Sequence, residues 1–347
     1  MTTTRERPLV SVTTVLDAWG RILRGHSPLL SIEITRECPL HCPGCYAYGD
    51  NHLGGGVTLR QLSDLRGDAL VDRVVQLVDH HRPLQLSIVG GEPLVRHREL
   101  SRLLPILSAK GIFTLVVTSG VIPFPREWND LPRIRVAVSI DGLRPEHDAR
   151  RHPATYDRIL QNIRDRRVDI SWVITNQMME RDGYLDEYLR YWTARPEVDR
   201  VWLSLYTPQK GEHSPEMLTA DARSRLLARL PALKRKFPSL ICPDGAIDAM
   251  ASPPASPAEC TFARLSLNYS ADLATRVEPC FFGGQPDCTQ CGCAVSTGLH
   301  WLRQRPLALG LTVGHLLDAS LAVGSLRKEA HLRAAVSQTP LPSGSCQ

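Results

Sequence analysis

The sequence has no run of about eighteen consecutive apolar residues, the length that a helix needs to cross a membrane. Its first residues, 1–8, also lack the apolar segment of a secretory signal peptide. Neither sign of charge dominates, because 41 basic and 36 acidic residues leave a net charge of +5, which indicates no particular class of partner. We therefore expect a cytoplasmic protein with no membrane span and no nucleic acid partner.

Cysteine is the residue type that stands out in this chain. There are 10 cysteines, and disulfides are rare in a reducing compartment, so clustered thiols indicate metal binding. Three lie near the start of the chain, and Cys242 and Cys346 stand apart. The second cysteine group comprises Cys260, Cys280, Cys288, Cys291 and Cys293. With 347 residues, 43% of them hydrophobic, the chain can form one large domain and a smaller one.

The first cysteine group, Cys38, Cys42 and Cys45, lies in one short stretch with spacings of three and two intervening residues. Thiolates are the usual ligands of iron–sulfur clusters, and three of them leave the fourth iron of a cubane cluster open for another ligand. Such a cluster can bind a substrate as well as transfer electrons. The alternative is a structural zinc site, which normally has a fourth Cys or His ligand, and His41 lies inside the stretch.

Apolar runs typical of strands alternate with segments of helical spacing up to about residue 236. The predicted strands are 29–34, 84–89, 112–117, 134–139, 169–175 and 201–205, and the predicted helices include 59–78, 100–107, 156–164, 184–192 and 221–236. Thr58 and Gln61 have the spacing of a capping box for the first of these helices. This alternation predicts a parallel sheet with helices outside it, with too few units to close an eight-stranded barrel.

Cys-x3-Cys-x2-Cys directly after an apolar strand resembles the signature of the radical S-adenosylmethionine (radical SAM) superfamily. The resemblance implies an α/β fold, a partial (β/α)6 TIM-like barrel, in which Cys38, Cys42 and Cys45 hold a catalytic [4Fe-4S] cluster. In that family the amino and carboxylate groups of SAM chelate the open iron, and SAM is cleaved reductively. The resulting 5′-deoxyadenosyl radical takes a hydrogen atom from the substrate. One departure is Gly44, where many members have an aromatic residue; here Tyr46 follows the third cysteine instead.

Two further segments match motifs of this family and predict residues that bind SAM. Gly90, Gly91 and Glu92 match the strand end that contacts its amino group; glycines allow close backbone approach, and a carboxylate accepts hydrogen bonds from an ammonium group. Ser139 and Asp141 resemble the fourth-strand segment of the SPASM-type branch, where they would lie near the ribose and carboxylate of SAM. Both segments are also typical of ordinary turns. Functional residues of barrels gather at the carboxyl ends of strands, where all of these are predicted.

The second cysteine group resembles the opening of a SPASM or shortened "twitch" domain, which binds auxiliary four-iron clusters. Its Cys-x2-Cys-x-Cys ending departs from the standard SPASM spacing, and there are fewer cysteines. We therefore expect one auxiliary [4Fe-4S] cluster, with four ligands drawn from Cys260, Cys280, Cys288, Cys291 and Cys293 and one of the five to spare. A structural zinc ribbon would use the same thiolates and stays open as an alternative.

The resemblance divides the chain into an N-terminal cover segment (1–28), a partial-barrel core (29–236) and a SPASM-like cysteine-rich region (237–347). It implies an enzyme that takes hydrogen from a peptide or small-molecule substrate, supplied with electrons by a donor such as flavodoxin or ferredoxin. Two other classes stay open, a non-catalytic iron–sulfur or zinc protein that senses redox state and a partner that delivers a cluster. The sequence identifies no residue that would contact the substrate.

Overall fold

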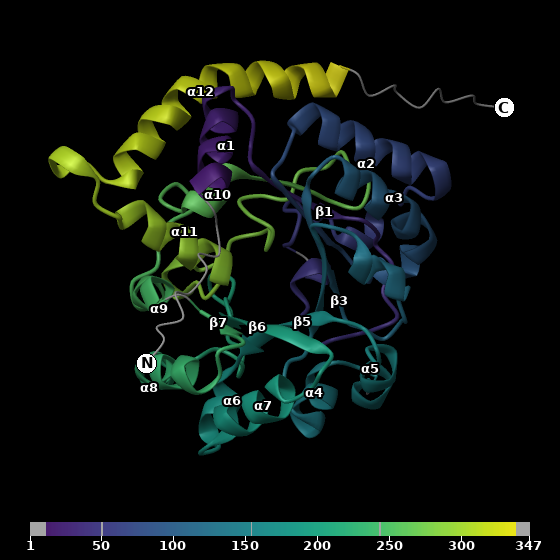
Figure 1. The fold of residues 1–347 in the computed structure, drawn as a ribbon, viewed down its shortest axis with the longest axis vertical. Helices are drawn as coiled ribbons and strands as arrows, with labels where there is room; N and C mark the ends of the chain where they lie inside the picture. The colour runs from purple at the N-terminus through teal and green to yellow at the C-terminus, as the bar shows by residue number, and fades with distance from the viewer. Residues whose placement is uncertain (1–11, 50, 154, 243, 338–347) are drawn as a thin grey trace.

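Eight parallel strands form a single sheet in the order β7-β6-β5-β4-β3-β2-β1-β8 (Figure 1). The computed structural model describes residues 12–49, 51–153, 155–242 and 244–337, so Cys346 lies outside the described residues. The strands are β1 (Leu29–Glu33), β2 (Gln85–Val89), β3 (Phe113–Thr118), β4 (Ile134–Ser139), β5 (Val168–Ile174), β6 (Val198–Leu205), β7 (Leu240–Ile241) and β8 (Ser266–Tyr269).

Helices surround this sheet and connect its strands, as expected for a partial TIM-like barrel. They are α1 (Val12–Leu23), α2 (Gly67–His81), α3 (His97–Ala109), α4 (Arg144–Arg150), α5 (Tyr156–Asn162), α6 (Asn176–Glu180), α7 (Tyr184–Thr193), α8 (Ala220–Lys236), α9 (Asp244–Ala251), α10 (Thr261–Leu265), α11 (Ala294–Gln304) and α12 (Val313–Ser337). The predicted α/β class and parallel partial barrel are confirmed, and all of the predicted strands are present as β1 to β6.

Two features of the fold differ from the prediction. The sheet has two more strands, β7 and β8, and β8 pairs with β1 in parallel although β8 comes after the whole predicted barrel core in the sequence. The helix predicted for residues 59–78 begins only at Gly67. Thr58 and Gln61 do form a capping box, but it caps a single 3-10 turn, η2 (Leu59–Gln61). Residues 59–66 have apolar residues at helical spacing, but contacts with other parts of the fold hold them in a non-helical conformation apart from this turn.

The core lies between the sheet and the helices that pack on it. The strands are rich in Val, Ile and Leu because a parallel sheet covered by helices is buried on both faces. Trp172 of β5 and Tyr188 of α7 are fully buried and stack with ring centroids 3.9 Å apart. Such a pair contributes about 1 kcal/mol beyond the area that it buries.

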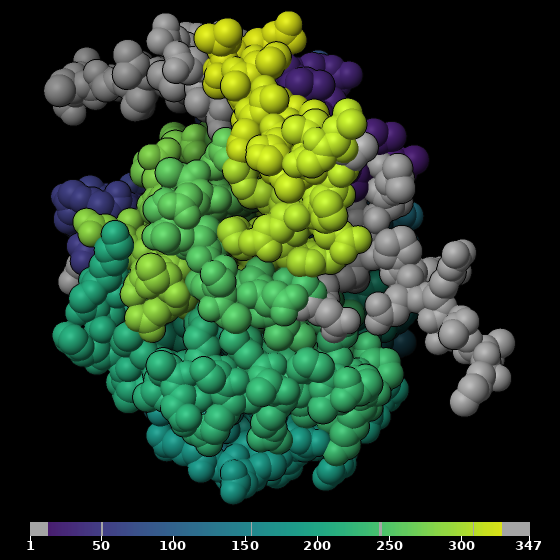
Figure 2. All heavy atoms as spheres, turned by 90° about the vertical axis from the view of Figure 1, so that its left-hand side faces the viewer, coloured from purple at the N-terminus to yellow at the C-terminus, as the bar shows by residue number. Residues whose placement is uncertain are grey.

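Helices α1 and α12, which come from opposite ends of the described chain, pack against each other, and α10, the helix before β8, joins their contact. Ile22 of α1, Leu265 of α10 and Leu317 of α12 form a small apolar cluster, and the Trp19 indole donates to the hydroxyl of Ser320 at 2.6 Å. Figure 2 shows α12 in yellow across this surface with α1 in purple beside it. Among the residues described, none of the helices is long and apolar enough to cross a membrane.

His81 at the end of α2 makes the stability of this fold depend on pH. It is buried, its Nε2 lies 3.0 Å from the hydroxyl of Tyr269 on β8, and burial lowers the pKa of its imidazole to about 3. The unfolded chain takes up a proton near pH 6.5 and the folded protein does not. The free energy of unfolding therefore falls below pH 6.5, by up to about 1.4 kcal/mol per pH unit from this residue.

We expect His81→Gln to reduce this dependence. Between pH 7 and pH 5 the free energy of unfolding should fall by about 1–2 kcal/mol less in the variant than in the unaltered protein. Urea denaturation at the two pH values measures the difference, and all other titrating groups are common to both proteins. Equal losses in the two proteins would show that His81 is protonated in the folded state.

Candidate functional site

The first cysteine group lies at the carboxyl end of β1, in a segment that we call the first cysteine loop (residues 34–49). Cys38, Cys42 and Cys45 are half-buried and form no disulfide. The amide of His41 donates to the carbonyl of His152 at 2.7 Å, which ties the loop to the segment after α4. The three thiols therefore lie at the face of the barrel where functional residues gather.

Charged side chains fix the start of this loop. Arg96 lies 2.9 Å from the carboxylate of Glu37 and 2.8 Å from that of Asp64, which also accepts a hydrogen bond from the Thr35 hydroxyl at 2.6 Å. The hydrogen bond from Arg96 lowers the pKa of the Glu37 carboxyl, so this pair is charged at neutral pH. The position of Cys38, the next residue, is thus set by an arginine that follows β2.

Gly90 and Gly91 bring the end of β2 into backbone contact with the first cysteine loop. The amide of Gly91 donates to the carbonyl of Thr35 at 2.8 Å, and that of Glu92 donates to the carbonyl of Glu37 at 2.7 Å. A Cβ at Gly91 would lie only 2.2 Å from the Glu37 oxygen, and Gly90 has a φ of +122°. The close approach predicted for these glycines is therefore made against the cysteine loop itself.

Glu92 is buried, and both of its carboxylate oxygens accept hydrogen bonds from the protein. The donors are the amide of Leu94 at 2.9 Å, the amide of Ser119 at 2.8 Å, and the hydroxyls of Thr118 and Ser119. These bonds cap the 3-10 turn η3 (Pro93–Arg96) and join the ends of β2 and β3. The carboxylate predicted to contact an ammonium group thus fixes the walls of the site.

Asp141 is fully buried just after β4 and forms ion pairs with two arginines. Its Oδ2 accepts from Arg150 and, at 2.7 Å, from the Nε of Arg151. Burial opposes its ionisation, but the two guanidinium groups outweigh burial and hold the pKa of the carboxyl below its ordinary value. Arg150 also pairs with Glu216 at 2.6 Å, whereas Ser139 lies half-buried at the end of β4. Oδ1 of Asp141 has no hydrogen-bond partner among the described residues.

These segments meet around the first cysteine group. Burial raises the pKa of the Cys38 thiol to about 11, and the nearby charge of Glu92 adds to this effect. Burial also raises the pKa of Cys42, whereas the guanidinium of Arg151 opposes the increase. Glu92 and Arg151 are therefore close to the thiols, from two different strand ends. Without a metal ion the thiols of Cys38 and Cys42 stay protonated, so metal binding would have to displace their protons.

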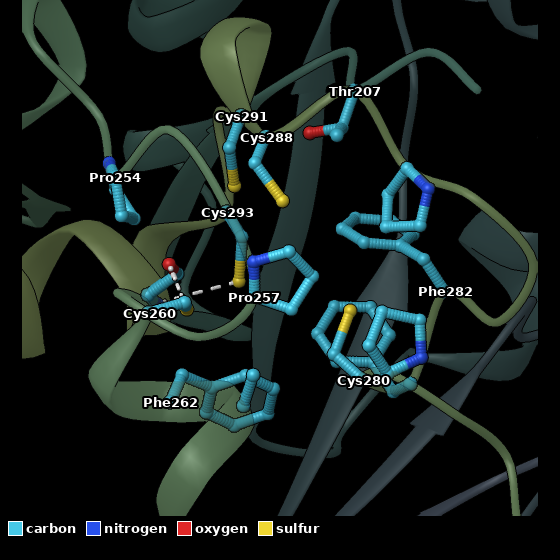
Figure 3. A pocket seen from close by; sticks show the side chains of 15 residues that line it. Thr207, Pro254, Pro257, Cys260, Phe262, Cys280, Phe282, Cys288, Cys291 and Cys293 are labelled. Atoms are coloured by element: carbon cyan, nitrogen blue, oxygen red, sulfur yellow. Dashed lines mark hydrogen bonds between the residues drawn. The ribbon is translucent and has the colours of Figure 1, made fainter. Parts of the chain in front are cut away.

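The second cysteine group surrounds one pocket, shown in Figure 3. All five of its predicted members line this pocket, together with apolar residues. Burial raises the pKa of Cys280 to about 12 and that of Cys288 to about 11, and the pKa values of both thiols respond to the charges of Cys260 and Cys291. Residues that are distant in the sequence thus present thiols to a common space, as a cluster site requires.

Cys293 differs from the other members of the second cysteine group. Its Sγ is the N-cap of α11, where it accepts from the amide of Ser296 at 3.5 Å. The hydroxyl of Ser296 also lies 3.2 Å from the Sγ of Cys260. Cys293 therefore has a structural task of its own at the start of a helix.

The segment that carries the second cysteine group is docked on the carboxyl end of β6. The amide of Gly292 donates to the Thr207 hydroxyl at 3.0 Å, and the amide of Leu205 donates to the carbonyl of Gly292 at 2.9 Å. In the same segment, the amide of Asp287 donates to the carbonyl of Pro208, the residue after Thr207, at 2.8 Å. Both cysteine groups are therefore held at the same end of the barrel.

Arg223 of α8 is a residue of this site that the sequence analysis missed. Its guanidinium donates to the carbonyls of Gln290 at 3.0 Å, Cys291 at 2.9 Å and Met250 at 2.6 Å. Burial lowers the pKa of Arg223, and the charge of the Cys291 thiol opposes this effect. An arginine on an amphipathic helix is usually solvated, so its sequence context gives no sign of this role.

The donors present are suited to iron–sulfur ligation. Cysteine thiols at half-buried or buried positions are the ligands that such clusters use, and each thiolate binds a different iron of the cubane. Within the described residues, no group of three or more His, Cys, Asp or Glu side chains is placed to hold a single metal ion. The orphaned Oδ1 of Asp141 is a further acceptor at the wall of the site.

Comparison with known proteins shows which family this part of the chain resembles. Residues 32–190 match the model of the Radical SAM superfamily. The fold is similar to that of Streptococcus suis SuiB bound to S-adenosylmethionine, with a TM-score of 0.50 and 14% identity over 78% of this chain and 64% of that chain. SuiB bound to its precursor peptide SuiA gives a TM-score of 0.51 and 15% identity over 78% and 65% of the two chains. No curated protein sequence matches the chain.

Residues 32–190 therefore form a radical SAM domain, which indicates an enzyme. The family implies a [4Fe-4S] cluster and SAM as cofactors. The likeness to SuiB concerns the fold, and the aligned part spans just under two thirds of the length of the SuiB chains.

Gly91→Ala tests the contact between β2 and the first cysteine loop. The added Cβ would overlap the Glu37 carbonyl and displace the residues before Cys38. If the first cysteine group holds the [4Fe-4S] cluster that the family implies, its iron should be lost in part, and the rate of SAM cleavage should fall about a hundredfold, the size of effect that a misplacement of about 1 Å can have in an active site. Iron content and 5′-deoxyadenosine formation measure the two effects.

Gly20→Ala is the matched control for this prediction. Gly20 lies inside α1, where an added Cβ meets only the side chain of Arg24 at 3.7 Å or more. This variant should keep its iron and its rate, because alanine is a better helix former than glycine. Unchanged iron and rate in Gly91→Ala would contradict the expected role of the glycine.

Proposed function

We propose that this enzyme cleaves SAM reductively at a [4Fe-4S] cluster held by Cys38, Cys42 and Cys45. When bound, the cluster and SAM supply a 5′-deoxyadenosyl radical that takes a hydrogen atom from the substrate. The observation that supports this proposal is the group of three half-buried thiols in one loop, braced by Glu37 and Gly91 at the carboxyl end of β1. Three thiolates leave one iron of the cluster open for SAM.

The residues around the thiols suit the polar groups of SAM. We assign the carboxylate of SAM to Arg151, whose guanidinium is near Cys42 and is held by Asp141 through its Nε. Ser139 can donate to the same region or to the ribose. In this proposal the carboxylates of Glu92 and Asp141 position neighbouring groups, because both already accept hydrogen bonds from the protein.

For the second cysteine group we propose an auxiliary [4Fe-4S] cluster ligated by Cys260, Cys280, Cys288 and Cys291. Two observations support this set. Besides burial, the charge of Cys260 raises the pKa values of Cys280, Cys288 and Cys291 in the shared pocket, and Cys293 already caps α11. Arg223 would hold the carbonyls that flank Cys291, so that this thiol keeps its direction.

Replacing single members of the second cysteine group tests this ligand set. We expect Cys293→Ser to retain about eight iron atoms per chain, and Cys288→Ser to lose close to four of them. Iron and zinc analysis of protein assembled without oxygen measures both values. Loss of iron in Cys293→Ser together with retention in Cys288→Ser would mean that Cys293 is a ligand and Cys288 is not. Zinc in place of iron at this group would overturn the auxiliary cluster.

The substrate that we propose is a peptide, with a small molecule as the alternative. The support for a peptide is the likeness in fold to SuiB, a protein whose structure has been solved with a precursor peptide bound. Electrons would come from a small reduced carrier such as flavodoxin or ferredoxin.

Anaerobic reconstitution tests the proposed function directly. Protein loaded with iron and sulfide is reduced with dithionite and incubated with SAM, and 5′-deoxyadenosine is measured over time. We expect slow formation of this product without any substrate. An intact and reduced cluster that forms none would favour the other classes, a redox-sensing iron–sulfur or zinc protein or a protein that delivers a cluster.

A further inference from the structure

A buried histidine connects the two cysteine groups. His52 follows the first cysteine loop and is 2% exposed. Its Nε2 lies 2.6 Å from Oε1 of Glu33, the last residue of β1, and its Nδ1 lies 3.0 Å from the carbonyl oxygen of Phe282. Phe282 lies two positions after Cys280. One imidazole ring thus joins the strand that leads into the first group with the segment that carries the second.

The directions of these hydrogen bonds follow from their partners. A carbonyl oxygen only accepts, so Nδ1 of His52 carries a hydrogen and donates to Phe282. Nε2 and the carboxylate of Glu33 share one further proton, and the second oxygen of Glu33 accepts from the hydroxyl of Ser270. Every polar atom of the pair therefore has a partner, which holds the ring in one orientation.

The backbones on either side of this histidine also touch. The amide of Gly284 donates to the carbonyl of His52 at 3.1 Å. A Cβ at Gly283 would lie 2.0 Å from that same oxygen, so only glycine permits this approach. The segment after Cys280 therefore cannot move without displacing His52.

Aromatic contacts complete the connection close to the thiols themselves. The ring of Tyr46, the residue after Cys45, lies 6.2 Å from the ring of Phe281 and 5.7 Å from that of Phe282. Phe281 is in turn the residue after Cys280. The two cysteine groups are thus joined through packed side chains with discrete contacts, which is the kind of path that can couple two sites.

We propose that His52 is a positioning residue that couples the two cysteine groups, so that filling the second group strengthens the binding of SAM at the first. The inference rests on the proposed function of both groups. Ligation at Cys280 fixes the position of the Phe282 carbonyl. Through its hydrogen bonds to this carbonyl and to Glu33, His52 then restricts the motion of β1 and of the segment after Cys45. Emptying the second group frees the carbonyl and loosens the first cysteine loop.

A double-mutant cycle tests this coupling. SAM is titrated into reduced protein, and its dissociation constant is read from the change in the EPR spectrum of the first cluster. The second group is emptied with Cys280→Ala/Cys288→Ala. His52→Gln keeps a donor for Glu33 but loses the hydrogen bond to Phe282, whereas His52→Asn keeps a donor near the position of Nδ1.

We expect emptying the second group to weaken SAM binding about tenfold in the otherwise unaltered protein. His52→Gln with the second group filled should weaken it by a similar factor, and the combined variant should be no weaker than either. His52→Asn keeps the hydrogen bond to Phe282 but loses the one to Glu33, so it should restore part of the affinity, through the segment after Cys45. His81→Gln, a change at another buried histidine, should leave the coupling intact.

Two results would overturn the inference. One is a multiplicative loss of about a hundredfold in the combined variant, and the other is an unchanged affinity when the second group is emptied. If His52→Gln does not accumulate, Tyr46→Leu removes the ring contacts to Phe281 and Phe282 and takes its place with the same expectation. Absence of any SAM effect on the unaltered protein would instead refute the proposed function.

Discussion

Replacing Cys38, Cys42 and Cys45 together by alanine is expected to abolish 5′-deoxyadenosine formation and to leave about four of about eight iron atoms per chain. The loss of activity should be complete, because the open iron that SAM needs belongs to the cluster held by these thiols. The remaining iron should be bound by the second cysteine group, whose pocket is built from other segments of the chain.

Iron analysis and EPR spectroscopy of the reduced protein measure both parts of this result. Cys242→Ala is the matched control, because Cys242 is a buried cysteine that directly follows β7 and belongs to neither group. This substitution should change neither the iron content nor the rate. Retention of all the iron in the triple variant would contradict the assignment of the first group. Loss of all the iron would contradict independent ligation at the second.

Asp141→Asn is expected to destabilise the protein by about 3 kcal/mol and to weaken SAM binding. The change removes the negative charge between Arg150 and Arg151. The two guanidinium groups then lie near each other without the carboxylate that pairs with both. Removing one partner of a buried ion pair has a cost of this size because the remaining charge is uncompensated. Arg151 would also lose the hydrogen bond that directs it toward the first cysteine group.

Chemical denaturation and SAM titration measure the two effects of Asp141→Asn. Asp157→Asn is a suitable control, because Asp157 pairs with Arg144 and both side chains are more than half exposed. Solvent screens an exposed pair such as this one, so the control should be nearly neutral. Equal effects of the two substitutions would contradict the special role of the buried carboxylate.

The sequence predicted the sheet well wherever a strand has a long apolar run of its own. It missed β8, whose four residues include Ser266 and Asn268, because these polar side chains are buried by partners far away in the chain. It also extended α2 too far toward its amino end. Asp64 is held there by Arg96 and Thr35 across the fold, and no local pattern reports such a contact.

The candidate site divides in the same way. Cysteine spacing identified both thiol groups, since ligands from one loop leave a local signature. The roles of Arg223 and His52 depend on partners such as Cys291 and Phe282 that are distant in the sequence. Glu92 and Asp141 were predicted as cofactor contacts; protein donors occupy both oxygens of Glu92 and Oδ2 of Asp141, whereas Oδ1 of Asp141 has no partner among the described residues. Their residue types indicated a role at the site, but only the fold shows which groups each carboxylate binds, Ser119 for Glu92 and Arg151 for Asp141.

The pairing of β8 with β1 has a consequence for biosynthesis. On the ribosome, β2 emerges soon after β1, but β8 is made only after the whole predicted barrel core has been translated. Until then one edge of β1 has no neighbouring strand, and Glu33 lacks Ser270. The strand that leads into the first cysteine loop therefore gains its last neighbour late in synthesis. A cluster inserted before the chain leaves the ribosome would bind to an incompletely folded site.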